Sequence, residues 1–248
     1  MTDAATPTLE IVALHPADAG PAQEGGADRL YLTSRVDPAL SDHDGLSVEA
    51  SLVSATCRET DLPVRPILRL SDSATTTGAE LIRLAGLAED YRAAGADGVV
   101  FAFLDSDLLL DLELCTALAD AIDGLPWTCH HLIDQTLEPD LVWRQLVGLA
   151  ESARLDGVHT AGSPRGLREG VDDLIARASR SRHVAALTIA GGGLEAEQVP
   201  WLVRAGVRRF TVGRAARPGS SYKAFVDARH VRAWRKLLDE QPVSATGR

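Results

Sequence analysis

One histidine near the middle of the chain is the first residue whose type and position could do chemistry. A period of two places Thr128 and His130 on one face of a strand and the bulky Trp127 on the other face, against helices. A neutral imidazole can act as a general base or a metal ligand near neutral pH. We expect Asp134 or Asp105 to share acid–base work with His130. The alternative is that His130 is a hydrogen-bonded structural residue.

A carboxylate in the middle of an apolar strand is the second candidate. Glu10 lies between Leu9 and Ile11, and alternation gives it the opposite orientation to both. A buried carboxylate costs several kcal/mol unless a cation, a metal or hydrogen bonds meet it. Arg69 is a candidate for its partner. The pair would be either a structural salt bridge or part of a metal or substrate site.

Two glycine turns late in the chain are candidates for anion binding. The residues are Gly191, Gly192 and Gly193 in one turn and Gly213 with Arg214 in the other. Glycine lets a ligand come close to main-chain N–H groups, which hold phosphate well at the start of a helix. The alternative is that the glycines only permit sterically tight turns.

The elements that position these residues are indicated by a repeated junction. An Ala-rich amphipathic segment ends at glycine and runs directly into an apolar burst, at Gly26-Ala27-Asp28, Gly95-Ala96-Asp97, Leu155-Asp156-Gly157 and Gly206-Val207. With the gaps filled, strands are predicted near 9–13, 29–32, 64–68, 98–103, 126–130, 157–160, 186–190 and 209–212. Eight strands separated by helices favour a single TIM-type (β/α)8 barrel over 9–240, with tails at 1–8 and 241–248. An open, doubly wound parallel sheet is the alternative.

In such a barrel the loops after the strands build the active face, so polar residues there carry more weight. Four of the seven histidines follow predicted strands: His15, His130, His131 and His159. We therefore predict His130, His15 and His159 as candidate metal ligands. The glycine turns follow strands seven and eight, where many barrels bind phosphate.

Composition excludes several classes of partner. The net charge of −10, with no Lys/Arg-rich run, disfavours binding to nucleic acid. No apolar stretch approaches the roughly 20 residues that span a bilayer. The three cysteines, Cys57, Cys115 and Cys129, show no zinc or disulfide spacing. We expect a cytoplasmic protein with reduced thiols and a small molecule or metal as its ligand.

From about Leu9 to Arg214 the sequence resembles the CutC copper homeostasis family. The matching pieces are Leu9-Glu10-Ile11, Gly25-Gly26-Ala27-Asp28-Arg29-Leu30, Gly45-Leu46-Ser47, Pro66-Ile67-Leu68-Arg69, Gly98-Val99-Val100 with Leu104-Asp105, Thr128-Cys129-His130-His131-Leu132-Ile133-Asp134, Thr160-Ala161-Gly162 and Ala190-Gly191-Gly192-Gly193. The resemblance implies a TIM-type barrel, copper or another divalent metal as ligand, and a homo-oligomer, dimer or tetramer. It also implies that Glu10, Arg69, His130 and Asp134 are the polar residues of the barrel mouth.

The chain departs from the family pattern at its soft ligands. The family usually has cysteines where this chain has Val12 and Thr33, and a carboxylate where it has Tyr31. Thiolates select Cu(I), whereas imidazole and carboxylate prefer Zn(II) or Cu(II). The sequence therefore argues against Cu(I) binding by the family's route.

Three functions remain open at this stage. The first is a CutC-like copper homeostasis or metal-binding protein. The second is a lyase, isomerase or hydrolase acting on a small phosphorylated or carboxylated metabolite, with His130 as the acid or base. The third is an oligomeric scaffold that binds neither.

Overall fold

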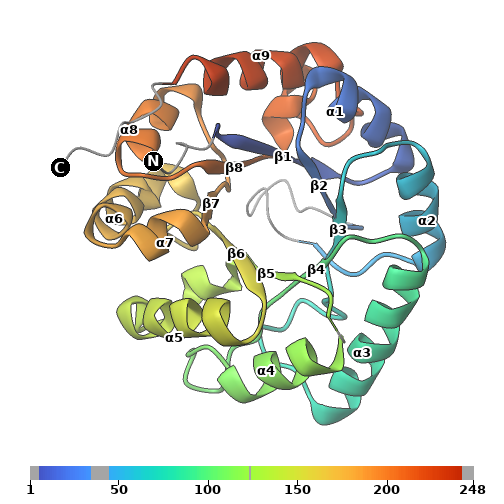
Figure 1. Cartoon of the computed structure of the whole chain (residues 1–248), viewed down its shortest axis with the longest axis vertical. Helices are drawn as coiled ribbons and strands as arrows, with labels where there is room; N and C mark the ends of the chain where they lie inside the picture. Colours follow the sequence, from blue (N-terminus) through green and yellow to red (C-terminus); the bar gives the residue numbers. More distant parts are fainter. Residues whose placement is uncertain (1–5, 35–44, 123, 242–248) are drawn as a thin grey trace.

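The computed structural model describes residues 6–34, 45–122 and 124–241, and these form one eight-stranded barrel ringed by helices (Figure 1). The strands are β1 (Thr8–Ala13), β2 (Arg29–Leu32), β3 (Val64–Pro66), β4 (Val99–Phe101), β5 (Trp127–Cys129), β6 (Leu155–Thr160), β7 (Thr188–Ala190) and β8 (Arg209–Val212). The helices are α1 (Ala19–Gly25), α2 (Ala50–Arg58), α3 (Gly78–Ala93), α4 (Leu112–Ala121), α5 (Pro139–Ser152), α6 (Leu167–Arg180), α7 (Arg182–Leu187), α8 (Val199–Arg204) and α9 (Ala228–Asp239).

All the strand pairs are parallel, and each strand lies next to its neighbour in sequence. The order runs β3-β2-β1-β8-β7-β6-β5-β4. A single bridge between Ile67 and Val100, just beyond β3, joins the two ends of this sheet and closes the barrel. The prediction of a TIM-type barrel is therefore confirmed, and the open doubly wound sheet is wrong. The first strand begins at Thr8, which the sequence placed in the N-terminal tail.

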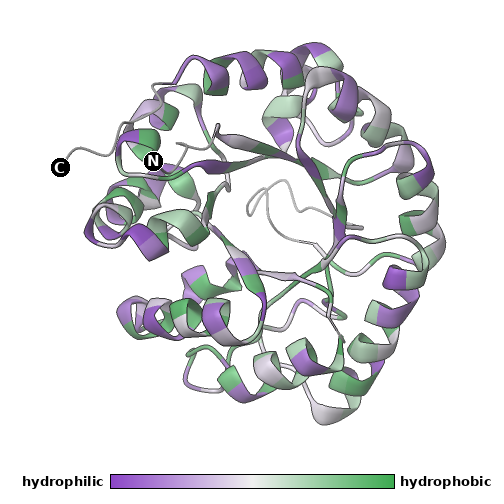
Figure 2. Cartoon of the chain, in the orientation of Figure 1, coloured by the Kyte–Doolittle hydropathy of each residue, from purple (hydrophilic) through white to green (hydrophobic). Residues whose placement is uncertain are grey.

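The helices cover the outside of the barrel with one apolar face each. In α5 the buried residues include Val142, Leu146 and Leu149, a spacing that puts them on one side of a helix. Each outer helix mixes hydrophobic with hydrophilic residues (Figure 2). The main hydrophobic core is therefore the layer between strands and helices, where Trp127 stacks on Phe101 with ring centroids 4.3 Å apart.

The predicted helix-to-strand junctions are correct at three of the four places. Gly26, Gly95 and Gly206 each have φ between 91° and 102°, the left-handed conformation that ends a helix before a strand. The fourth prediction is wrong because Gly157 lies inside β6, and Arg154 takes the left-handed conformation there with φ 57°. Gly157 instead leaves room in the barrel interior for the side chain of Arg209, because a Cβ atom there would lie 2.6 Å from Arg209 Nη1.

Candidate functional site

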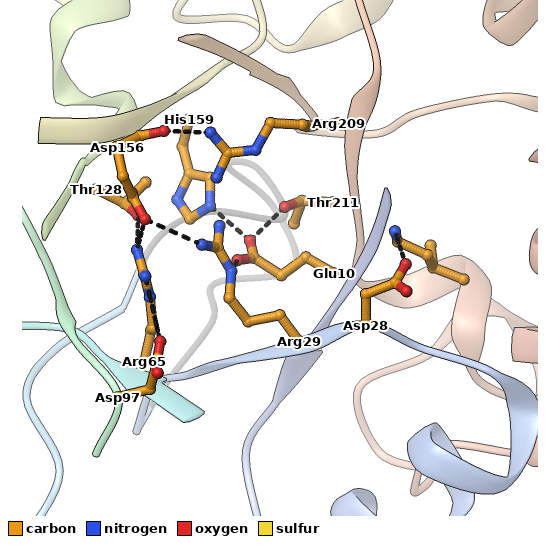
Figure 3. Close-up of polar contacts among 11 residues, drawn as sticks. Glu10, Asp28, Arg29, Arg65, Asp97, Thr128, Asp156, His159, Arg209 and Thr211 are labelled. Carbon is orange, nitrogen blue, oxygen red and sulfur yellow. Dashed lines mark hydrogen bonds and ion pairs between the residues drawn. The ribbon is translucent and has the colours of Figure 1, made fainter. Parts of the chain in front are cut away.

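Three arginines form a layer across the barrel near the N-terminal ends of the strands (Figure 3). Arg29 and Arg209 begin β2 and β8, and Arg65 is the second residue of β3. Arg65 binds Asp156 at 2.5 Å and Asp97 at 3.2 Å, and it donates to the hydroxyl of Thr128 at 2.9 Å. Charged side chains from β2, β3, β6 and β8, together with Asp97 before β4, therefore meet in one polar cluster, called here the ionic layer.

Glu10 lies beside this layer and is almost completely buried. Its carboxylate accepts from Arg29 Nε at 2.5 Å, from the hydroxyl of Thr211 at 2.5 Å and lies 2.5 Å from His159 Nε2. Burial alone would raise the pKa of Glu10, but Arg29 and His159 hold it well below its usual value. The partner of Glu10 is thus Arg29, and the predicted pairing with Arg69 is wrong.

An apolar layer lies above the charges, toward the C-terminal ends of the strands. It consists of Val12, Tyr31, Ile67 and Val100, all fully buried. Val12 lies two residues beyond Glu10 on β1, and Tyr31 lies two residues beyond Arg29 on β2. This apolar plug separates the ionic layer from the mouth of the barrel.

Of the three histidines predicted as metal ligands, none lies with the other two in a ligand cluster. His159 is paired with Glu10, and His15 accepts a main-chain bond from Ala17 at 3.1 Å and packs on Phe225. Across the described parts of the chain, no group of three or more His, Cys, Asp or Glu side chains could hold a metal ion. The structure thus gives no support for a site built from all three histidines, and the role of His130, His15 and His159 as metal ligands stays a prediction.

His130 is buried at the end of β5, as its alternation predicts. Its Nδ1 accepts from the main-chain N–H of Leu132 at 3.4 Å and so begins the short 3-10 helix His131–Gln135. The His130 and His131 rings are 4.0 Å apart between centroids. The fold therefore places the imidazoles of His130 and His131 side by side at the end of β5.

Asp134 belongs to the same short helix, but its carboxylate faces the end of β6. It accepts from the hydroxyl of Thr160 at 2.5 Å and from the Ala161 N–H at 2.7 Å. Burial raises the pKa of Asp134 to about 7, because these neutral donors offset only part of the lost hydration. A carboxyl group with this pKa can carry a proton at physiological pH.

Arg69 and Asp105 are both engaged locally. Arg69 donates through Nη2 to the main-chain oxygen of Asp72 at 2.8 Å. Asp105 accepts from the N–H groups of Asp107 and Leu109, each at 2.9 Å, and so fixes the turn after β4. These contacts position loops at the mouth, and the predicted catalytic roles of Arg69 and Asp105 stay predictions.

The glycine turns follow β7 and β8 as expected. Gly192 and Gly193 have φ of 81° and 87°, and Gly191 donates its N–H to Thr160 at 3.1 Å. Gly213 precedes the short helix that begins at Arg214. The Gly191 N–H is therefore already hydrogen-bonded within the fold. Anion binding at these turns stays a prediction.

Two groups of charged residues escaped the sequence analysis. Arg29, Arg65 and Arg209 were missed as interior residues. The alternation with inward Tyr31 and Thr211 on the same strands, and with Ile67 just beyond β3, is a signal that could have found them. The second group is Asp18 and Arg217, which form a buried ion pair at 2.8 Å. Nothing in their spacing, about 200 residues apart, could have indicated it.

The cysteines do not supply a copper site at the mouth. Cys115 and Cys129 are buried in the core outside the barrel, and burial raises the pKa of both thiols. Cys57 packs against the same core from α2 and its thiol pKa is also raised. The family that this chain resembles has cysteines at the positions of Val12, on β1, and Thr33, just beyond β2. Both side chains are fully buried here.

Comparison with known proteins gives a consistent result. The model of the CutC family matches residues 8–214. A family protein CutC of Klebsiella pneumoniae (strain 342) is 25% identical over 201 residues, which are 81% of this chain and 77% of the relative. The copper homeostasis protein cutC homolog of Homo sapiens is 29% identical over 180 residues, 70% of this chain and 60% of the human protein.

Solved structures show the same fold. The putative copper homeostasis protein CutC of Streptococcus agalactiae superposes with a TM-score of 0.69 at 19% identity, covering 84% of this chain and 98% of that one. Orotidine 5'-phosphate decarboxylase of Pyrococcus horikoshii OT3 has a TM-score of 0.58 at 15% identity, covering 93% of this chain and 99% of that one. At these identities the structural likeness concerns the fold alone.

Proposed function

The chain belongs to the CutC family, and on that premise we propose that it takes part in copper homeostasis without holding Cu(I) through thiolates. The first half of the proposal is supported by the family match over residues 8–214 and by the name of the human relative. The second half comes from the side chains of this chain. The carrying observation is that Val12 and Thr33 occupy the places of the family's cysteines.

The thiols elsewhere are unsuited to the metal. A thiolate, not a thiol, is the ligand, and a raised pKa keeps the thiol protonated at neutral pH. Cys115 and Cys129 are both fully buried and have raised pKa values. Burial and a raised pKa therefore disfavour Cu(I) binding at Cys115 and Cys129.

The adjacent imidazoles of His130 and His131 are the contact that suits copper best. Imidazole binds Cu(II) and Zn(II) well. Both rings are buried at the end of β5, with exposed fractions of 1% and 8%. Two ligands make an incomplete site, so we expect weak, exchangeable Cu(II) binding rather than storage of the metal.

A gene deletion in the source organism tests the proposed role. We expect the deletion to change growth in excess copper and the copper content of the cells. The wild-type gene should restore both, and the His130→Ala variant should restore them less well. Unchanged growth and copper content after deletion would contradict the proposal.

A metal titration tests the part that concerns thiolates. Purified protein should fail to take Cu(I) from a chromophoric competitor, while the double variant Val12→Cys/Thr33→Cys should gain Cu(I) binding because it restores soft ligands. Cys57→Ser is the matched control, and it should behave as the wild type. Tight Cu(I) binding by the wild type would show that the proposed mode is wrong.

A further inference from the structure

A small cavity opens at the N-terminal end of the barrel, away from the mouth. Its volume is about 160 Å³, and its polar lining consists of Thr8, Glu10, Asp28, Arg29 and Arg209. These residues lie at or next to the starts of β1, β2 and β8. The cavity therefore leads into the ionic layer, below the apolar plug.

Arg209 differs from the other two arginines of the ionic layer in its partners. Arg29 and Arg65 each contact a carboxylate at 2.5 Å. The guanidinium of Arg209 donates instead to the main-chain oxygen of Asp156 (Figure 3), and within the described residues it forms no ion pair with a carboxylate. A half-buried cation is thus left with one neutral acceptor.

The carboxylates near Arg209 already have other partners. Glu10 is held by Arg29 and His159, and Asp156 is held by Arg65 at 2.5 Å. Asp28 accepts from the Leu9 N–H and from Arg235, at 2.7 and 3.0 Å. Burial and the nearby Arg29 lower the pKa of Arg209 to about 10, as expected for a cation with too little counter-charge.

The backbone leaves space for this guanidinium. A Cβ atom on Gly157 would lie 2.6 Å from Arg209 Nη1 and 2.7 Å from Ile189 Cδ1. A side chain at this point of β6 would displace the ends of Arg209 and Ile189 from their present positions at the cavity wall. The position of the cation is therefore built by the fold rather than left to a mobile surface side chain.

We propose that this cavity binds a small oxyanion, of the size and charge of inorganic phosphate or sulfate, on the guanidinium of Arg209. A guanidinium presents parallel N–H donors that match two oxygens of such an anion. Arg29 lies on the same wall with its charge paired to Glu10, and Asp28 on that wall is paired with Arg235, so Arg209 carries the charge left for the anion. The volume of about 160 Å³ has room for one small ion.

This site is separate from the glycine turns after β7 and β8, which belong to the opposite end of the barrel. The apolar plug of Val12, Tyr31, Ile67 and Val100 lies between the two ends. The two ends of the barrel are therefore alternative places for an anion, and a single pair of variants can decide between them. Arg209→Gln removes the cation at the N-terminal end, and Arg214→Gln removes the one beside Gly213.

The test is titration of inorganic phosphate and of sulfate into the full chain, followed by calorimetry, with chloride of equal ionic strength as the control. We expect saturable binding to one site, with affinity reduced about tenfold or more in Arg209→Gln, since a charge-assisted bidentate contact is lost. Arg214→Gln should bind like the wild type. Absence of saturable binding by the wild type, or loss in Arg214→Gln alone, overturns the proposal.

A second pair of variants covers the case in which Arg209→Gln fails to fold. Thr8 is exposed at the cavity entrance and lies opposite Arg209 in the β1–β8 register. Thr8→Glu should weaken phosphate binding and Thr8→Lys should strengthen it, because each places a charge near the bound anion. Equal affinities in the two variants would show that the anion does not bind in this cavity.

Discussion

Glu10 is buried against Arg29 and His159 near the N-terminal end of the barrel, whereas Asp134 is buried near the other end against a hydroxyl and a main-chain amide. Both carboxyls lose hydration. Only Glu10 gains a cation in exchange, and its pKa falls while that of Asp134 rises to about 7. Neutral donors therefore do not compensate for burial as a guanidinium does.

The two carboxyl groups also suit different roles, Glu10 in stability and Asp134 in proton exchange. The ionised Glu10 links β1, β2, β6 and β8 through its partners, which suits the end of a barrel that usually serves stability. Asp134 is poised to gain or lose a proton close to the end where barrels bind and react. The comparison predicts opposite responses to mutation and to pH at the two carboxyls.

Removal of Glu10 should have the largest effect. Glu10→Ala leaves Arg29 buried without its carboxylate, which costs about 3–5 kcal/mol of unfolding free energy. Urea unfolding at pH 7 measures it. The exposed pair of Glu89 and Arg92, 3.9 Å apart, is the control, and Glu89→Gln should cost less than about 1 kcal/mol.

The effect of Glu10 should disappear in acid. Its folded pKa is below the ordinary value of 4.5, so its stabilisation is complete at neutral pH and is lost as the pH falls below 4.5 toward the folded pKa. Equal costs for Glu10→Ala at pH 7 and at pH 3 would contradict the assignment of an ionised, paired carboxylate.

Asp134 should show the opposite slope. Its folded pKa is about 7 and its ordinary value is 3.8, so the folded state keeps a proton that the unfolded chain releases between these values. Stability should thus be full below pH 3.8 and fall as the pH rises to 7, by up to about 4 kcal/mol at roughly 1.4 kcal/mol per pKa unit.

The matched variant for this slope is Asp134→Asn, which cannot titrate. Asparagine loses one acceptor for the Ala161 N–H, so the variant starts from a lower stability that does not change with pH. The difference between wild type and variant should therefore shrink from pH 5 to pH 8. Parallel curves over that range would show that Asp134 is ionised throughout.

A glycine substitution tests how tightly the ionic layer is packed, and its effect should be the smallest. A Cβ on Gly98 would lie 2.5 Å from the Pro126 oxygen and 3.0 Å from Arg65 Nε. Gly98→Ala should cost about 1–3 kcal/mol by overpacking. Gly148, on α5, has nothing within 4 Å of its Cβ position, and Gly148→Ala should stabilise by roughly 0.5–1 kcal/mol. Thermal unfolding of both variants compares them, and a harmless Gly98→Ala would mean a loose layer.

The local pattern of the chain determined much of the fold. Eight apolar bursts, three of them introduced by a left-handed glycine, were enough to predict the strands and the closed barrel, because an αβ junction is specified by adjacent residues. The alternation around Glu10 and His130 predicted that both would be buried, since side-chain direction along a strand depends only on parity.

Only the tertiary structure decided which buried groups meet. Glu10 contacts Arg29 from the next strand, His159 from β6 and Thr211 from β8, and the sequence had offered Arg69 as a candidate. Parity gives the face of a side chain, but its height in the barrel depends on the stagger of each strand, and its partner across the interior depends on closure. Among the described residues, the same geometry forms no metal-binding group from His15, His130 and His159, and it sets the guanidinium of Arg209, which has no carboxylate partner there, at the end opposite the mouth.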